Sequence, residues 1–282
     1  MMHIRALDAP LGAEVADIDL AAPLSNDAVA ILLDALFEYL VLVFPDQQLD
    51  DAQHVDFARH WGELQVHVLN QYRHGDRPEI YMVTNLDENG RSRGEHPDPG
   101  AAIWHSDGSW SAQRGLVTML HAQRLPAKGG DTLFANMYAA YEGLSDADKA
   151  LIEHLKAVHD LAHSRRQTVA REQLTDAQKI AAPPVEWPLV RTHPETGRKC
   201  LYLGQHASHI AGMSLGRGRI LIQRLNEHAT QPQYVYRHVW KPNQFVMWDN
   251  RAVLHSATDF DWINDVRVLR RTTTVGERIV SE

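Results

Sequence analysis

The most informative pattern in this sequence is the stretch Ile103-Trp104-His105-Ser106-Asp107-Gly108-Ser109-Trp110. It places a histidine and an aspartate two residues apart. On an extended strand such residues project from the same face, so an imidazole and a carboxylate can bind one metal ion. A second histidine would complete the two-histidine, one-carboxylate set that suits non-haem Fe(II). Because the chain contains 17 histidines, the pair alone decides nothing, and its partners must be sought elsewhere.

His255 is the best candidate for the third ligand. It follows a strand-like segment at 244–248, a polar turn at 249–251 and three apolar residues. A histidine at the end of an apolar segment that follows a tight turn can point into the mouth of a barrel. Histidines in such places are more often simply hydrogen-bonded, so ligation depends on the neighbouring residues.

The segment Val266–Thr273 has an unusual arrangement of arginines. The period of two in a strand places Arg267 and Arg271 on one face and Arg270 on the other. If the first face turns inward, its two guanidinium groups need anionic partners, and two ligand anions would suit them. If that face points to solvent, Arg270 is the buried exception. From the residues alone both alternatives stay open.

Composition excludes several classes of protein. The net charge of −8 argues against nucleic acid or an anionic membrane as the main partner. Cys200 is the only cysteine, so no intramolecular disulfide forms. The first 20 residues are acidic and lack a signal peptide, and no stretch is long enough to span a membrane. We expect one domain over residues 1–282, located in the cytoplasm.

Helix and strand signals alternate along the chain. Helices are predicted after the capping residues Ser25 and Asp50, and over Leu215–Ala229. Residues 85–102 are polar and rich in glycine and proline, whereas 160–188 are polar with little periodicity. We therefore expect active-site loops at 66–102 and 160–188.

Four blocks in order along the chain carry a resemblance to a known family: 103–107, 129–137, 248–251 with His255, and 267–273. Together they resemble the Fe(II)/2-oxoglutarate-dependent dioxygenases that include taurine dioxygenase and aryloxyacetate (2,4-D-type) dioxygenase. The resemblance extends from Leu11 to Gly276. It implies a mixed α/β fold with a mainly β core, a double-stranded β-helix (jelly roll) flanked by helices.

The resemblance also implies roles for residues of all four blocks. His105, Asp107 and His255 would be the catalytic metal ligands that hold Fe(II). Thr132 and Arg267 would bind the distal carboxylate of the cosubstrate 2-oxoglutarate. An arginine together with a hydroxyl is a chemically sound carboxylate site.

Residues for the primary substrate follow from the same resemblance. Arg271 aligns with the family arginine that binds the acidic group of the substrate, and His67 with a substrate-contacting histidine of the taurine branch. A purely structural role for His67 is equally open. Arg198, His206 and His209 also stand out, but turn stabilisation and surface exposure explain them as well as substrate contact does.

The chain departs from the taurine pattern near the expected substrate. Ala101, Ala102 and Ile103 replace polar residues, and Asn70 replaces an aromatic one. A zwitterionic aminosulfonate is therefore disfavoured. The best candidate is an aryloxyalkanoate-type carboxylate, cleaved to a phenol and an oxo acid, and the alternative is an alkylsulfonate that releases sulfite.

Two readings from other classes compete with the oxygenase. A zinc hydrolase could use the same three ligands around a metal-bound water, but it would leave Thr132, Arg267 and Arg271 without a role. A non-catalytic jelly-roll binding protein would not need the intact ligand set. The expected partners are a small organic anion and O2, with no nucleic acid and no membrane, and the resemblance implies a homo-oligomer.

Overall fold

The computed structural model describes residues 2–87, 89–94, 99–167 and 173–277. The strands are β1 (His3–Ala6), β2 (Ala13–Ala16), β3 (Val41–Phe44), β4 (Glu63–Leu64), β5 (Tyr81–Thr84), β6 (Gly115–Arg124), β7 (Thr132–Asn136), β8 (Lys156–His159), β9 (Val185–Pro188), β10 (Val190–Thr192), β11 (Lys199–Leu201), β12 (Ala207–Ile210), β13 (Val235–His238), β14 (Phe245–Asp249), β15 (Val253–Ala257) and β16 (Val268–Val275). The α-helices are α1 (Asn26–Tyr39), α2 (Asp51–Arg59), α3 (Met137–Glu142), α4 (Asp146–Ile152), α5 (Leu161–Arg166), α6 (Asp176–Ala181) and α7 (Leu215–Ala229). Short 3-10 helices are η1 (Asn70–Tyr72), η2 (Pro99–Ala102) and η3 (Pro232–Tyr234).

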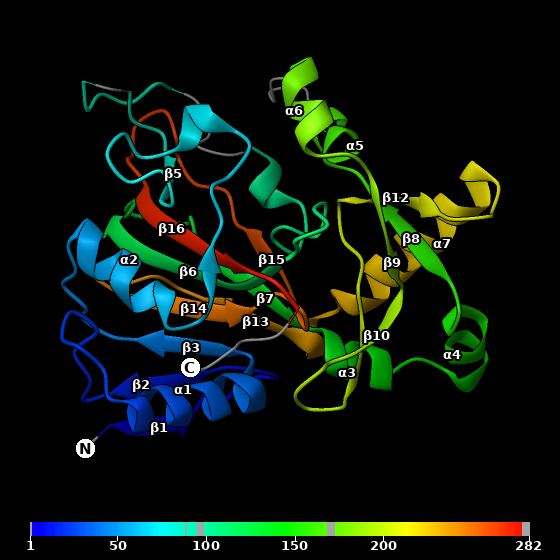
Figure 1. Cartoon of the computed structure of the whole chain (residues 1–282), viewed down its shortest axis with the longest axis horizontal. Coiled ribbons are helices and arrows are strands. Elements are labelled where there is room, and N and C mark those ends of the chain that lie inside the picture. Colours follow the sequence, from blue (N-terminus) through cyan, green and yellow to red (C-terminus); the bar gives the residue numbers. More distant parts are fainter. Residues whose placement is uncertain (1, 88, 95–98, 168–172, 278–282) are drawn as a thin grey trace.

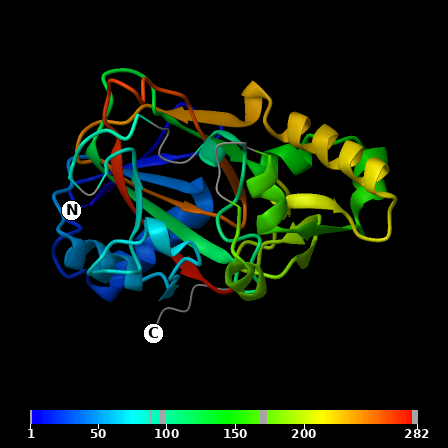
Figure 2. The same cartoon turned by 90° about the horizontal axis from the view of Figure 1, so that it is seen from above.

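Two sheets form the centre of the molecule (Figure 1). The larger has the strand order β1-β2-β3-β14-β6-β16-β4, with β5 also paired to β16. The smaller has the order β13-β7-β15. Smaller sheets, β12-β8-β9 and β10-β11, lie toward the end of the molecule that carries α7, away from the N-terminal strands (Figures 1 and 2).

The side chains of β14 show how the large sheet packs on both faces. Phe245 and Met247 belong to the core shared with α1 and α2, whereas Val246 and Trp248 belong to the core that includes β7 and β15. All four are fully buried, as the period of two requires for a central strand with both faces covered. The result is two facing sheets with helices on the outer face of one, and it confirms the predicted mixed α/β jelly roll.

The structure confirms the predicted helix starts, because both predicted capping residues form capping hydrogen bonds. The Ser25 side chain accepts a hydrogen bond from the Ala28 backbone at the start of α1. Asp50 and Gln53 form a reciprocal capping box at the start of α2. Helix α7 has the predicted bounds, Leu215–Ala229. Within the described residues, no helix is long and apolar enough to cross a membrane.

The two segments expected as active-site loops contain short regular elements. Residues 66–102 include η1, β5 and η2, and residues 160–188 include α5, α6 and β9. Each is only a few residues long, too short to show a clear period in the sequence. Residues 88, 95–98 and 168–172, which belong to these segments, lie outside the described residues.

Candidate metal centre and its pocket

The segment 103–110 is held against β15 by a single backbone bridge. The His105 amide donates to the His255 carbonyl at 2.9 Å, and the His255 amide donates to the His105 carbonyl at 2.8 Å. The expected strand through Asp107 is wrong, because the chain turns directly after the bridge. Gly108 makes this turn possible: its φ is +67°, and a Cβ there would lie 2.5 Å from the Gly115 amide nitrogen. The bridge, not a strand period, places the two histidines side by side.

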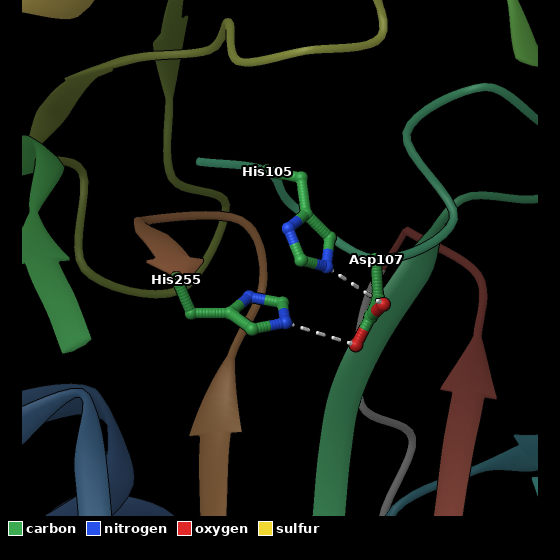
Figure 3. Close-up of side chains that lie close together, drawn as sticks. All are labelled: His105, Asp107 and His255. Atoms are coloured by element: carbon green, nitrogen blue, oxygen red, sulfur yellow. Dashed lines mark ion pairs between the residues drawn. The ribbon is translucent and has the colours of Figure 1, made fainter. Parts of the chain in front are cut away.

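The three predicted ligands meet at one point (Figure 3). One donor atom from each of His105, Asp107 and His255 lies within 4.8 Å of the other two. The His105 Nε2 is 3.9 Å from the Asp107 Oδ1, and the His255 Nε2 is 3.6 Å from the Asp107 Oδ2. All three residues are buried. Two imidazole nitrogens and one carboxylate oxygen thus form a facial set of three donors, which is the arrangement that non-haem Fe(II) sites use.

The protonation state of the cluster suits a divalent cation. The His105 Nδ1 donates to the Ile103 carbonyl at 2.8 Å, which leaves the lone pair of Nε2 facing the cluster. Burial, together with the nearby His105, lowers the pKa of His255 well below its usual value, so this imidazole is neutral. Burial alone would raise the pKa of Asp107, but Arg271 and the two histidines outweigh it and lower that pKa. The cluster therefore offers two lone pairs and one negative charge.

Arg271 reaches this cluster from β16. Its Nη1 donates to the Asp107 Oδ1 at 3.0 Å, and its guanidinium stacks on the Tyr81 ring at 4.2 Å. Its side chain is 13% exposed, so it is not on a solvent-facing strand face. Arg270, the next residue, is also buried. Both faces of β16 thus turn inward, which decides between the two alternatives that the sequence left open.

In the described structure, Arg267 and Thr132 do not line the pocket whose wall contains His105 and Asp107; Arg267 lies against Gly130, two residues before Thr132. It is buried, and its Nε donates to the Gly130 carbonyl at 3.1 Å. Burial lowers the pKa of Arg267 to about 10, which still leaves it charged at neutral pH. The nearby Asp131 is paired with Arg237 at 2.6 Å, and among the described residues no carboxylate forms an ion pair with Arg267. A buried guanidinium in this state is a good site for a ligand anion.

Strand register relates Thr132 to the metal ligands. In the β15–β7 ladder His255 pairs with Phe134, and Ala257 pairs with Thr132. Thr132 is therefore on the same sheet face as His255 and two residues along, roughly 7 Å away in the strand direction. Its hydroxyl accepts a hydrogen bond from the Trp240 indole at 3.0 Å, which leaves its own hydrogen for another acceptor.

A pocket opens beside the three-residue cluster, with His105 and Asp107 in its wall. His67 lines it, and its ring contacts those of Tyr81 and Trp110 at centroid distances of 5.0 and 5.3 Å. The lining also contains residues that the sequence patterns did not single out: Leu69, Tyr81, Trp110, Leu161, Arg165 and Gln205. His206, whose role the sequence left open, belongs to the same wall. Arg165 and Leu161 are one helical turn apart on α5, a spacing that the segment is too short to reveal.

Other residues considered from the sequence do not line this pocket. Asn70 is exposed, and residues 101–103 are absent from the pocket wall as far as the structure describes it. Arg198 pairs with Glu142 at 2.8 Å near the surface, and His209 contacts the Ser208 hydroxyl. The departures from the taurine pattern at 70 and 101–103 therefore do not bear on the wall of this pocket.

Comparison with known proteins supports the same chemistry. Residues 3–273 match the family described as taurine catabolism dioxygenase TauD, TfdA family. An α-ketoglutarate-dependent 2,4-dichlorophenoxyacetate dioxygenase of Burkholderia sp. (strain RASC) is 39% identical, over 94% of this chain and 91% of the relative. An (S)-phenoxypropionate/α-ketoglutarate dioxygenase of Sphingobium herbicidovorans is 35% identical, over 97% and 95%. The crystal structure of AAD-2 in complex with Mn(II) and N-oxalylglycine is 37% identical, with a TM-score of 0.88 over all of both chains.

Proposed function

The chain belongs to the taurine catabolism dioxygenase family of TauD and TfdA, and on that premise we propose that it oxidises an aryloxyalkanoate. It is a dioxygenase that uses Fe(II) and 2-oxoglutarate. In the proposed reaction one oxygen atom of O2 hydroxylates the carbon next to the ether oxygen, and the other enters succinate as CO2 leaves. The hydroxylated ether collapses to a phenol and an oxo acid.

The observation that carries this proposal is the composition of the pocket. Two guanidinium groups, those of Arg271 and Arg165, line the pocket beside the candidate metal ligands. Among its mostly polar lining residues, Leu69, Trp110 and Leu161 form one apolar wall. An acid with an apolar body matches both features: its carboxylate pairs with Arg271, and its ring packs against the apolar wall. Two relatives named for phenoxy acids support the same substrate class.

We assign the metal and cosubstrate residues as follows. His105, Asp107 and His255 hold the iron through the atoms that already face one another. Thr132 and Arg267 bind the distal carboxylate of 2-oxoglutarate: Thr132 provides a hydroxyl two residues along the sheet from His255, and Arg267 provides a buried cation that forms no ion pair with a described residue. Fe(II), when bound, supplies the centre at which 2-oxoglutarate and O2 react. His67 lines the substrate side of the same pocket.

The chain's own residues contribute orientation and exclusion of water. The Arg271 guanidinium holds the acid end of the substrate and thereby presents the adjacent C–H bonds to the metal ligands. Tyr81 supports that guanidinium from one side. Burial and the nearby His105 hold the pKa of His255 well below its usual value, so this imidazole donates no proton to the substrate carboxylate. The protein thus selects the carbon that is oxidised by fixing the anion beside it.

An alkylsulfonate is the second candidate substrate. A guanidinium binds a sulfonate as well as a carboxylate, and the matching family model is named for taurine catabolism. Oxidation of the carbon that bears the sulfonate would release sulfite and an aldehyde.

The test is a substrate screen with purified protein, Fe(II), 2-oxoglutarate and O2. We expect aryloxyacetates and aryloxypropionates to give succinate and phenol in equal amounts, and Zn(II) in place of Fe(II) to give neither. Sulfite from alkylsulfonates without phenol from any aryloxy acid would replace the proposed substrate by the second candidate. Hydrolysis supported by Zn(II) would instead favour the hydrolase.

A further inference from the structure

Behind Asp107 lies a chain of buried hydrogen bonds that connects β6 to the turn after β14. The Thr118 hydroxyl contacts the Asp107 Oδ2 at 2.8 Å, and the Asn250 Nδ2 contacts the Thr118 Oγ1 at 2.8 Å. Thr118 is fully buried and Asn250 is 1% exposed. Neither residue belongs to the ligand set or to the wall of the pocket.

The contacts of Asn250 determine the orientation of its amide. Its Oδ1 receives the Trp248 indole N–H at 3.0 Å and the Asp107 backbone N–H at 3.2 Å. Both groups can only donate, so the atom between them must be the amide oxygen. The NH2 group therefore faces Thr118, and it too can only donate.

This orientation fixes the direction of the Thr118 hydroxyl. Its oxygen accepts from Asn250, so its single hydrogen has two possible acceptors, the Asp107 Oδ2 at 2.8 Å and the Thr273 Oγ1 at 3.1 Å. A carboxylate is the stronger acceptor and is also the nearer one. The hydrogen points to Asp107, and the Thr273 hydroxyl donates to Thr118.

We propose that Thr118 and Asn250 are positioning residues that hold the Asp107 carboxylate in its metal-binding orientation. A carboxylate rotates easily about its last side-chain bond, and a directed hydrogen bond at Oδ2 restricts that rotation. The inference rests on the proposed function, because it takes the three-residue cluster to be the metal centre.

Asn250 also joins the two segments that carry the ligands. These contacts use its backbone. The Ser106 hydroxyl donates to the backbone carbonyl of Asn250 at 2.7 Å, and the backbone N–H of Asn250 donates to the backbone carbonyl of Leu116 at 2.8 Å. His255 follows five residues later on the same stretch of chain. One residue thus fixes the turn before the third ligand against the segment that holds the first two.

The experiment measures metal affinity rather than turnover. Co(II) is titrated into the metal-free full-length protein and followed by its visible absorption, with thermal unfolding as a check on the fold. We expect Thr118→Val, which keeps the shape but removes the hydroxyl, to weaken Co(II) binding by about 10- to 100-fold and to change the absorption spectrum. Thr118→Ser restores the hydroxyl and should bind within about threefold of wild type.

Thr273→Val is the matched control. It removes a buried hydroxyl that contacts Thr118 at 3.1 Å but forms no hydrogen bond with Asp107 in the described structure. It should leave the Co(II) affinity within about threefold of wild type. A double-mutant cycle tests the role of Asn250. If Asn250 acts through Thr118, the combined loss in Thr118→Val/Asn250→Ala is smaller than the sum of the two single losses.

The outcomes separate this inference from the proposed function. Wild-type protein that binds no Co(II) would overturn the metal centre itself. Wild-type protein that binds Co(II), together with a Thr118→Val variant of unchanged affinity and spectrum, would overturn only the positioning role. Equal losses in Thr118→Val and Thr273→Val would show a general packing effect, and additive losses in the cycle would remove Asn250 from the proposal.

Discussion

Arg270 and Arg271 are neighbours on β16, yet they lie in two regions of different character. The Arg270 guanidinium donates to the Asp51 carboxylate, the Leu49 carbonyl and the His121 Nδ1. These partners come from the start of α2, the segment before it and β6. The cluster closes the outer face of the large sheet and has no access to the metal pocket in the described structure.

Arg271 has a different set of partners. Among the described residues its one hydrogen bond goes to Asp107, a carboxylate that also faces two histidines. Its side chain is 13% exposed and lines the pocket. The same residue type is therefore structural where protein groups occupy its donors, and available to a ligand where they do not. The predictions below test this distinction.

The largest effect is expected for Arg271→Ala in the Fe(II)-loaded protein. Without this guanidinium the substrate carboxylate loses a buried, charged hydrogen bond. We therefore expect kcat/KM for an aryloxy acid to fall by about 10³-fold, which corresponds to about 4 kcal/mol of transition-state stabilisation. Binding of 2-oxoglutarate should change little. Steady-state kinetics and a 2-oxoglutarate titration check both statements. Loss of 2-oxoglutarate binding in this variant would assign Arg271 to the cosubstrate instead.

Arg270→Met should act on stability and not on catalysis. We expect the free energy of unfolding to fall by about 3 kcal/mol, the lower end for a broken buried pair, because Asp51 is 33% exposed and stays partly hydrated. Urea unfolding measures this change. Below the unfolding transition kcat/KM should stay within about threefold of wild type. A catalytic loss as large as that of Arg271→Ala would erase the distinction between the two arginines.

Arg267→Ala should raise the KM for 2-oxoglutarate by about 30-fold, or about 2 kcal/mol, since a charge-assisted hydrogen bond is lost. The KM for the aryloxy acid should remain unchanged, which is the opposite of the Arg271→Ala result. Thr132→Val should act in the same direction with a smaller effect. Parallel KM measurements for both substrates decide the matter: an unchanged 2-oxoglutarate KM would contradict the assignment.

The last prediction concerns a gradual effect, the pH dependence of stability in the Arg270 region. Burial, with the charge of Arg270 beside the ring, lowers the pKa of His121 to about 4. Because the unfolded chain takes up a proton near pH 6.5, stability is complete above that pH and falls as pH drops toward 4. The slope is about 1.4 kcal/mol per pH unit for this group. Urea unfolding at several pH values should show a shallower slope in His121→Gln and an unchanged one in His3→Gln, which alters an exposed histidine.

Much of the molecule was predictable from local patterns. Caps and periodicity located α1, α2 and α7, and the ordered blocks placed the three ligands in one cluster. These features depend on residues close together in sequence or on motifs with few alternatives. The strand expected through Asp107 is wrong because the chain turns at Gly108, directly after the bridge between His105 and His255.

The residues missed by sequence reasoning share a physical cause. Arg165, Gln205 and Trp110 enter the pocket from segments that lie far apart in the chain and have short, irregular elements. Thr118 and Asn250 look like ordinary polar residues in the sequence, and only their contact with Asp107 gives them a role. Long-range contacts of this kind leave no local period to detect.

The sequence by itself determined the ligand types, their order and the strand period that separates Arg270 from Arg271, because side-chain chemistry and backbone alternation are local properties. Only the tertiary structure decided that both faces of β16 are buried and which carboxylate each arginine meets. Burial and partners depend on how α2, β6 and the turn after His105 pack around that strand. A guanidinium bound by protein groups and one left for a ligand are identical in sequence and differ only in those neighbours.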